Sequence, residues 1–311
     1  MSYHRADFAP LRSTGYGIGF HWTTWTQPRT GQVKPFEEAV ETFDVDALVE
    51  QVVESGAGHL VFPVTHALHY IPGPNAEVDK IIASRTCKRD LIMEIADALA
   101  KADIKLALYY HHGCDMSDQD PQWQAAVGGQ SLDQTKFHDS YCKVVNWMSE
   151  HYGPKVIAYW FDACYGPMRR AAPPFDRWAK AAKAGYADRL IGYNAGIERH
   201  TLFTPLQDYW AGESIRLNFM PRTPLTPAGL PWYAYTSWHA FEGAALGGEW
   251  GMSEQSVKLD WPPPCVDSVV QYIKRFQNVG GIAAFNLLCY QDGSILESDL
   301  QVMKDVRKLI R

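Results

Sequence analysis

The chain has 311 residues, of which 46% are hydrophobic, 21% charged and 13% aromatic. This composition is typical of a soluble globular protein with a sizeable core, and it excludes intrinsic disorder. The formal net charge is −6 and no run of basic residues occurs, so charge argues against a nucleic-acid or membrane partner. Because no segment resembles a signal peptide or a membrane span, we expect a cytoplasmic protein.

Eight short segments rich in β-branched and aromatic residues are predicted to be strands. Near-continuous apolar runs of this kind are typical of parallel strands that helices cover on both faces. The segments are residues 16–22, 59–65, 105–111, 156–162, 189–194, 207–213, 231–238 and 282–288.

Helical patterns fill several of the intervals between these strands. Asp44 is a predicted N-cap, an apolar stripe follows it, and Gly56 ends the pattern, which together indicate a helix. Similar stripes follow Arg89 and Asp133, and weaker helices are predicted at 175–186, 265–279 and 299–310.

The alternation of strands and helices predicts an α/β fold, a single (β/α)8 TIM-like barrel that spans residues 1–311. We expect this barrel to be irregular. The fifth and sixth strands begin at residues 189 and 207, which is too close for a full helix. Pro221, Pro224 and Pro227 interrupt the next interval, so the fifth and sixth helices should be degenerate.

Active sites of such barrels lie at the C-terminal ends of the strands. Nearly every predicted strand ends in a side chain that can ionise, form hydrogen bonds or cover a ligand. These residues are His21, Trp22, His66, His69, His111, His112, Asp162, Asn194, Glu213, Trp238, His239 and Asn286.

Two carboxylates follow aromatic strands. Asp162 ends Tyr-Trp-Phe-Asp, and Glu213 follows a Tyr-Trp-Ala-Gly stretch two strands further along. Paired carboxyl groups above an aromatic floor are what glycoside hydrolysis needs, one ionised and one protonated. Glu198, Glu242 and Glu249, all in predicted loops, compete with Glu213 for the second role.

Several short sequence blocks follow one another along the chain. They are 16–22 (YGIGFHW), 88–91 (KRDL), 106–110 (LALYY), 160–162 (WFD), Asn286 and 292–293 (DG). This set resembles glycoside hydrolase family 29, the α-L-fucosidases. The resemblance implies that His21 binds the sugar and that Asp162 is the nucleophile. Residues 210–216 (WAGESIR) are similar to the acid/base segment of one branch of the family, which implies that Glu213 is the acid/base.

The resemblance predicts a retaining exo-glycosidase that cleaves a terminal α-linked L-fucose or a related sugar through a covalent glycosyl-enzyme intermediate. Residues at or just beyond strand ends are then expected to bind the sugar. The expected binding residues are His21, Trp22, His66, His69, Tyr70, His111, Trp160, Asn194 and Trp238.

The chain also departs from the family pattern. Where the family shows Lys-His-His-Asp-Gly, this chain has Thr-His-Ala-Leu-His at 65–69, so Ala67 replaces one sugar-contacting histidine. The family usually appends a C-terminal β-sandwich, and we expect none here.

Two other functions fit parts of the pattern. A metal-dependent hydrolase or sugar isomerase would use as ligands His66, His69, His111, His112 and Asp162, but the histidine spacing is against it. A non-catalytic sugar-binding barrel would fit the altered 65–69 segment but leaves both carboxylates unexplained.

No motif predicts a cofactor or a metal, and the unpaired spacing of the six cysteines favours reduced thiols. A small carbohydrate is the expected partner, and a homo-oligomer is left open.

Overall fold

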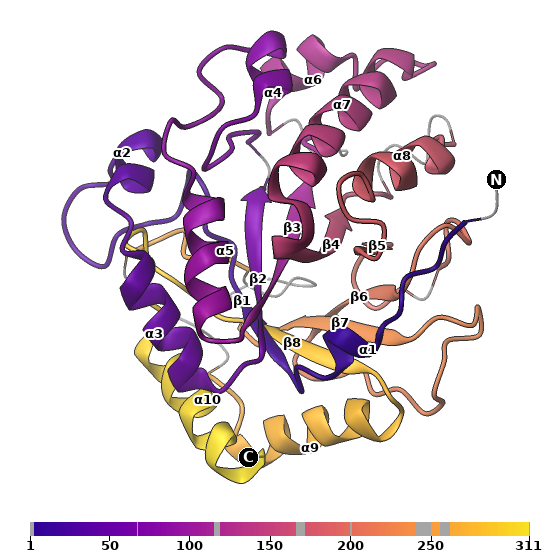
Figure 1. Ribbon diagram of the computed structural model, residues 1–311. Helices are drawn as coiled ribbons and strands as arrows, with labels where there is room; N and C mark the ends of the chain where they lie inside the picture. The colour runs from indigo at the N-terminus through magenta and orange to yellow at the C-terminus, as the bar shows by residue number, and fades with distance from the viewer. Residues whose placement is uncertain are drawn as a thin grey trace.

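Eight parallel strands form the centre of the computed structural model (Figure 1). The structure describes residues 3–66, 68–114, 119–165, 172–199, 201–239, 250–255 and 262–310. The strands are β1 (Gly17–Gly19), β2 (His59–Thr65), β3 (Lys105–His111), β4 (Val156–Asp162), β5 (Leu190–Tyr193), β6 (Trp210–Ile215), β7 (Trp232–Ser237) and β8 (Ile282–Asn286). All eight overlap the predicted segments.

The strands follow the order β5-β4-β3-β2-β1-β8-β7-β6. Because β1 pairs in parallel with both β2 and β8, the first and last strands meet and the sheet curls into a nearly closed barrel. Among the described residues, no strand ladder joins β5 to β6. The predicted (β/α)8 TIM-like barrel and its irregularity are thus confirmed.

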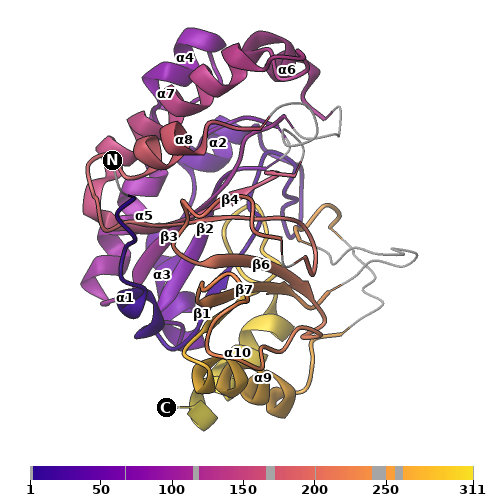
Figure 2. The same ribbon diagram turned by 90° about the vertical axis from the view of Figure 1, so that its right-hand side faces the viewer.

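Helices surround the barrel, as Figures 1 and 2 show from two directions, and all but α1, whose Leu11 belongs to the interior cluster, pack on its outside. They are α1 (Ala9–Arg12), α2 (Phe36–Glu41), α3 (Val45–Ser55), α4 (Ala76–Ile81), α5 (Leu91–Lys101), α6 (Pro121–Val127), α7 (Thr135–Tyr152), α8 (Phe175–Ala182), α9 (Val266–Asn278) and α10 (Glu297–Ile310). In the described parts of the intervals β5–β6 and β6–β7 there is no helix, as predicted. The short helices α1, α2, α4 and α6 were not predicted, because two turns or fewer carry little periodicity.

Local signals explain where the longer helices begin. The Asp44 carboxylate accepts a hydrogen bond from the Ala47 amide at 2.9 Å, and α3 ends at Gly56, both as predicted. Asp90 caps α5 in the same way, accepting from the Met93 amide at 3.0 Å. These caps satisfy amide groups that the first helical turn leaves without a partner.

Side chains alternate between the inside and the outside of the barrel along each strand. On β4, Tyr159 and Phe161 belong to the core beneath the helices, whereas Ala158 and Trp160 belong to the barrel interior. The same alternation turns Asp162 inward at the end of the strand. The strand period therefore decides which strand-end residues can meet.

Gly19 on the first strand leaves room for the Tyr235 hydroxyl group. A Cβ atom on Gly19 of β1 would lie 2.7 Å from the Tyr235 hydroxyl oxygen and 2.6 Å from the Val61 carbonyl oxygen. A larger residue at this position would displace Tyr235, which contacts the site described below.

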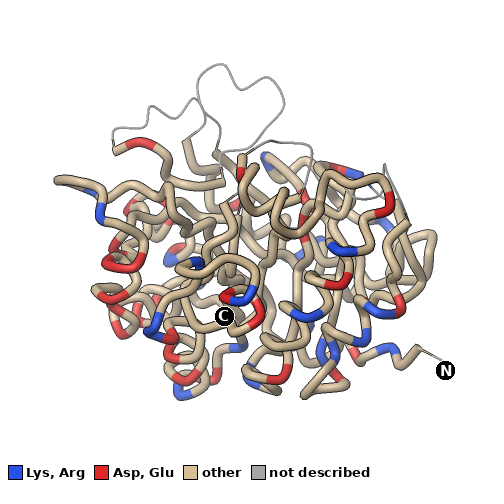
Figure 3. Tube along the Cα trace, turned by 90° about the horizontal axis from the view of Figure 1, so that it is seen from above, with Lys and Arg blue, Asp and Glu red and all other residues tan. Residues whose placement is uncertain are grey.

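Acidic and basic positions are interspersed along the trace in the view of Figure 3. Within the described ranges, no helix is long and apolar enough to cross a membrane. The absence of a nucleic-acid or membrane partner stays a prediction.

Candidate active site

A small cavity lies at the C-terminal ends of the strands. Its volume is about 30 Å³, which holds water but not a larger ligand unless lining side chains move. The lining residues are His21, His66, Tyr109, Trp160, Asp162, Asn194, Glu213, Tyr235 and Trp250. Six of them were predicted site residues, namely His21, His66, Trp160, Asp162, Asn194 and Glu213.

One amide group joins the two carboxyl groups. The Asn194 side-chain nitrogen donates to Asp162 Oδ1 at 2.7 Å and to Glu213 Oε2 at 2.8 Å. The Gly196 amide donates to Asn194 Oδ1 at 2.8 Å, which fixes the orientation of the side-chain amide. Asp162 Oδ1 and Glu213 Oε2 both lie within 2.8 Å of this nitrogen, so these two oxygens are less than twice that distance apart.

Asp162 is held from its other side by a phenol. The Tyr109 hydroxyl donates to Asp162 Oδ2, so each carboxyl oxygen of Asp162 accepts a hydrogen bond. Burial and the nearby Asp162 charge raise the pKa of Tyr109 well above its usual value, so the phenol keeps its proton. Two donors on its two oxygens are the partners that an ionised carboxylate needs.

Glu213 lies in a different electrostatic environment. Burial and the charge of Asp162 raise its pKa to about 8, although the hydrogen bond from Asn194 acts in the opposite direction. Glu213 therefore holds its proton at neutral pH. The pair combines a carboxylate with two donors and a carboxylic acid, which is the division of roles that acid-assisted displacement requires.

His21 presents a defined tautomer to the cavity. The Asn286 side-chain nitrogen donates to the Trp250 carbonyl at 2.8 Å, which leaves Asn286 Oδ1 as an acceptor. Tyr235 and the His21 Nδ1–H group both donate to this oxygen at 2.8 Å. Burial lowers the pKa of His21 to about 4, so the ring is neutral and its Nε2 atom can accept a hydrogen bond from a ligand.

The histidines at the ends of β2 and β3 lie side by side, but only one lines the cavity. The His66 ring is 4.9 Å from that of His21 and 5.2 Å from that of His111, centre to centre. His111 lies behind His66, and its Nδ1 atom accepts from the Gly113 amide at 3.1 Å. The predicted binding residue His111 therefore lies next to a lining residue but is not among the lining residues itself.

Four predicted binding residues lie elsewhere, because their side chains turn away from the barrel interior. The Trp22 indole donates to the Gln291 carbonyl in the outer core, and the Trp238 indole donates to Asp299. His69 stacks on Trp123 with ring centres 3.6 Å apart, and the Tyr70 ring lies beneath the Arg85 guanidinium. The structure therefore does not bring Trp22, His69, Tyr70 or Trp238 to the cavity.

Sequence reasoning missed three lining residues, namely Tyr109, Tyr235 and Trp250. Tyr109 and Tyr235 lie one inward position before the ends of their strands, so the two-residue period could have found them. Trp250 lies on a loop and packs against His21, with ring centres 5.3 Å apart. No local signal marks it.

Of the competing carboxylates, the structure describes only Glu198. Glu198 is exposed on the loop after β5, and its backbone amide donates to the Glu213 carbonyl at 2.8 Å. Glu242 and Glu249 lie outside the described residues.

Two residues of the metal-site alternative, His69 and His112, have other partners. His69 Nε2 is 2.9 Å from the Tyr110 hydroxyl, and His112 Nε2 donates to the Ala163 carbonyl at 2.9 Å. Over the described part of the chain, no three His, Cys, Asp or Glu side chains are placed to hold a metal ion together.

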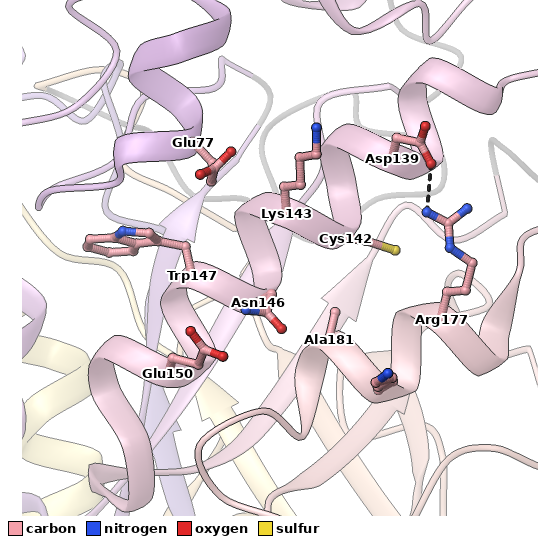
Figure 4. A pocket seen from close by; sticks show the side chains of 10 residues that line it. Glu77, Asp139, Cys142, Lys143, Asn146, Trp147, Glu150, Arg177 and Ala181 are labelled. Atoms are coloured by element: carbon pink, nitrogen blue, oxygen red, sulfur yellow. Dashed lines mark hydrogen bonds and ion pairs between the residues drawn. The ribbon is translucent and has the colours of Figure 1, made fainter. Parts of the chain in front are cut away.

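A wider groove of about 630 Å³ lies on the outer helices α4, α7 and α8 (Figure 4). It carries charges of both signs, and Asp139 and Arg177 form an ion pair across 2.6 Å. It shares no lining residue with the cavity at the strand ends, so we place the candidate active site at the latter.

A (β/α)8 barrel that holds two carboxyl groups and aromatic side chains at the C-terminal ends of its strands has the architecture of a glycoside hydrolase. A sequence profile of the alpha-L-fucosidase family matches residues 13–189, more than half of the chain. The chain belongs to this family and is a glycosidase. A search of curated protein sequences found no match.

Solved structures share the fold. The alpha-L-fucosidase AlfC from Lactobacillus casei, in complex with alpha-L-fucose product, is 15% identical with a TM-score of 0.69, and 97% of each chain is covered. A covalent intermediate of an alpha-L-fucosidase from Bacteroides thetaiotaomicron is 15% identical with a TM-score of 0.67, covering 99% of this chain and 76% of that chain. An endo-fucoidan hydrolase of glycoside hydrolase family 107 is 13% identical with a TM-score of 0.68, covering 98% and 94%.

Proposed function

We propose that the chain hydrolyses a terminal α-linked L-fucose, or a close stereochemical relative, with net retention of anomeric configuration. The observation that carries this proposal is the Asn194 bridge between Asp162 and Glu213. It brings one oxygen of each carboxyl group within 2.8 Å of the same nitrogen, which supports the roughly 5–5.5 Å separation of retaining glycosidases over the roughly 6.5–9.5 Å of inverting ones. Family membership supports fucose as the sugar.

In the first step, an oxygen of Asp162 attacks the anomeric carbon while the bond from that carbon to the glycosidic oxygen breaks. Glu213, which is protonated at neutral pH, gives its proton to the departing oxygen. The products of this step are the free alcohol and a glycosyl ester on Asp162. Tyr109 and Asn194 hold Asp162 in place for the attack.

In the second step, water enters beside Glu213, which is now a carboxylate and acts as a base. Glu213 takes a proton from the water as the oxygen attacks the anomeric carbon, and Asp162 leaves as a carboxylate. Two displacements at the same carbon restore the original anomeric configuration.

The remaining lining residues supply sugar contacts in this proposal. His21 Nε2 accepts from a sugar hydroxyl, and His66 lies beside it to contact a neighbouring hydroxyl. Trp160 provides an apolar wall, since aromatic rings cover the apolar face of a sugar. The cytoplasmic location and the single domain stay predictions.

The test is the anomer that is released first. We expect NMR spectra recorded during hydrolysis of an aryl α-L-fucoside to show α-L-fucose before mutarotation produces the β form. Early appearance of the β form would contradict retention. A panel of aryl glycosides tests the sugar itself, and preference for a sugar of different stereochemistry at several carbons would contradict fucose.

A further inference from the structure

The chain turns sharply just after the proposed nucleophile. Ala163 is buried and has a φ angle of +58°, in the left-handed region. A residue with a Cβ atom rarely adopts this conformation, because the Cβ atom then lies too close to the following carbonyl oxygen. Such a backbone persists only where its surroundings hold it. The turn at Ala163 therefore needs a partner.

His112 is that partner. Its Nε2–H group donates to the Ala163 carbonyl at 2.9 Å. The Cys114 amide donates to the other ring nitrogen, Nδ1, at 3.0 Å, so Nδ1 carries no proton and Nε2 carries one. These two hydrogen bonds fix both the tautomer and the orientation of the ring. The Ala163 carbonyl is thus tied to a ring that is itself held in place.

The His112 ring belongs to the outer core and not to the cavity. His112 directly follows β3, is buried, and does not line the cavity at the strand ends. The Phe137 ring of α7 meets it edge-on, with ring centres 5.2 Å apart, and the Trp123 indole donates to the His112 carbonyl at 3.0 Å. His112 therefore acts on a bound sugar only through the residues that it holds.

Asp162 lies between the strand ladder and this turn. The ladder from β3 to β4 ends at Asp162, and just past it the hydrogen bond from His112 to Ala163 ties the chain again. The direction of the Asp162 side chain depends on the backbone on both sides of its Cα atom, so the turn helps to set it. That direction decides whether the two carboxyl oxygens meet their donors, Tyr109 and Asn194.

We propose that His112 is a positioning residue, which holds the left-handed turn at Ala163 and so aims the Asp162 carboxylate at the anomeric carbon. This inference rests on the proposed function. Loss of the His112 donor then slows the attack of Asp162 without weakening the binding of the sugar. A glycine at position 163 makes the donor dispensable, because glycine adopts the left-handed conformation readily.

Four variants test this role. His112→Asn keeps an acceptor near the Nδ1 position, for the Cys114 amide, and removes the donor to Ala163. His112→Gln is the conservative variant, because its longer side chain places an amide nitrogen near the Nε2 position. The double variant combines His112→Asn with Ala163→Gly. The matched control is His138→Asn, the same change at a buried histidine of α7 whose ring nitrogens have no hydrogen-bond partner among the described residues.

Two quantities are measured for each variant. The value of kcat/KM on 4-nitrophenyl α-L-fucoside reports the attack of Asp162, and the dissociation constant of L-fucose, from isothermal titration calorimetry, reports the sugar pocket. We expect kcat/KM to fall about tenfold to 10²-fold in His112→Asn, the scale of a small misplacement of reacting groups, with an unchanged dissociation constant. His112→Gln and the double variant should recover most of this loss, and His138→Asn should behave as wild type.

A folded His112→Asn enzyme with kcat/KM within about twofold of wild type overturns the inference. A loss that Ala163→Gly does not recover, or one that L-fucose binding shares, also overturns it, because His112 is then only part of the core. If His112→Asn does not fold alone, the double variant decides: activity near that of wild type supports the inference, and anything less overturns it. A wild-type enzyme inactive on the fucoside overturns the proposed function and this inference with it.

Discussion

The two sides of the barrel are built differently. Strands β1 to β4 pair through parallel ladders and are separated by segments that contain the helices α2 to α7. Between β5 and β6 and between β6 and β7, the described residues form loops instead of helices, and no ladder joins β5 to β6. The regular side holds Asp162 and Tyr109, and the irregular side holds Asn194 and Glu213.

A buried carboxylate takes the place of the missing ladder. Asp208 accepts hydrogen bonds from the amides of Ile191 and Ala6, both at 2.9 Å, and from the Tyr3 hydroxyl at 3.0 Å. Lys183 forms an ion pair with Asp208 at 2.9 Å, and the backbone amide of Asp208 donates to the Ile191 carbonyl at 2.8 Å. Asp162, the proposed nucleophile, thus lies on a strand with ladders on both sides, whereas Glu213, the proposed acid, lies beside a seam held by side chains.

The largest expected effect is on the regular side. Asp162→Asn removes the group that forms the covalent bond, so turnover should be lost on every substrate. The loss should exceed the roughly 10²–10⁴-fold cost of losing proton transfer alone. The matched control is Asp188→Asn, the same change at an exposed aspartate, whose rate should equal that of wild type. Substantial activity of Asp162→Asn on an aryl fucoside would remove Asp162 from the role of nucleophile.

The acid on the irregular side should fail in a different way. Glu213→Gln cannot protonate the leaving group, which should slow hydrolysis of natural linkages by about 10²–10⁴-fold. Activated aryl groups depart without a proton, so their first step survives, and azide should restore turnover by attacking the intermediate in place of activated water. The control is Glu198→Gln. If that variant loses activity while Glu213→Gln behaves as wild type on an unactivated substrate, the roles must be reassigned.

The seam itself can be broken without touching the cavity. Asp208→Ala leaves the Ile191 amide and the Lys183 charge without their partner in a buried place, which should lower the free energy of unfolding by about 3 kcal/mol. Urea unfolding measures this quantity. The control Asp188→Ala, at an exposed site, should change it by less than about 0.5 kcal/mol. Equal effects of the two variants would mean that the seam does not depend on Asp208.

Most of the fold was predictable because its signals are local. Apolar runs marked every strand, and capping residues such as Asp44 marked helix starts within the same few positions that they stabilise. The closure between β5 and β6 was not predictable. There Asp208 contacts Ile191 of β5 and also Tyr3 and Ala6, the last two more than 200 positions away in the sequence.

The site was predictable to the extent that its residues follow the inward period of a strand. His21, Asp162 and Glu213 each line the cavity, whereas Trp22, one position later, turns into the outer core. A choice of residues by nearness to a strand end takes in both the inward and the outward face of the strand. For this reason Trp22 and Trp238 were expected to bind the sugar. Trp250 lines the cavity from a loop, where no period applies.

The smallest expected effect concerns Asn194, which joins the two sides. For the wild type, kcat/KM should fall as pH rises through about 8, because Glu213 must be protonated to act as the acid. The hydrogen bond from Asn194 lowers the pKa of Glu213, so Asn194→Ala should raise that pKa and move the falling limb to higher pH. The rate at the plateau should also fall, because Asp162 loses a donor, but a rate loss alone would not move the limb. Asn218→Ala, the same change at an exposed position on the loop after β6, should leave the limb in place. If the fall of kcat/KM occurs at the same pH or at lower pH in Asn194→Ala, the hydrogen bond from Asn194 does not control the proton on Glu213.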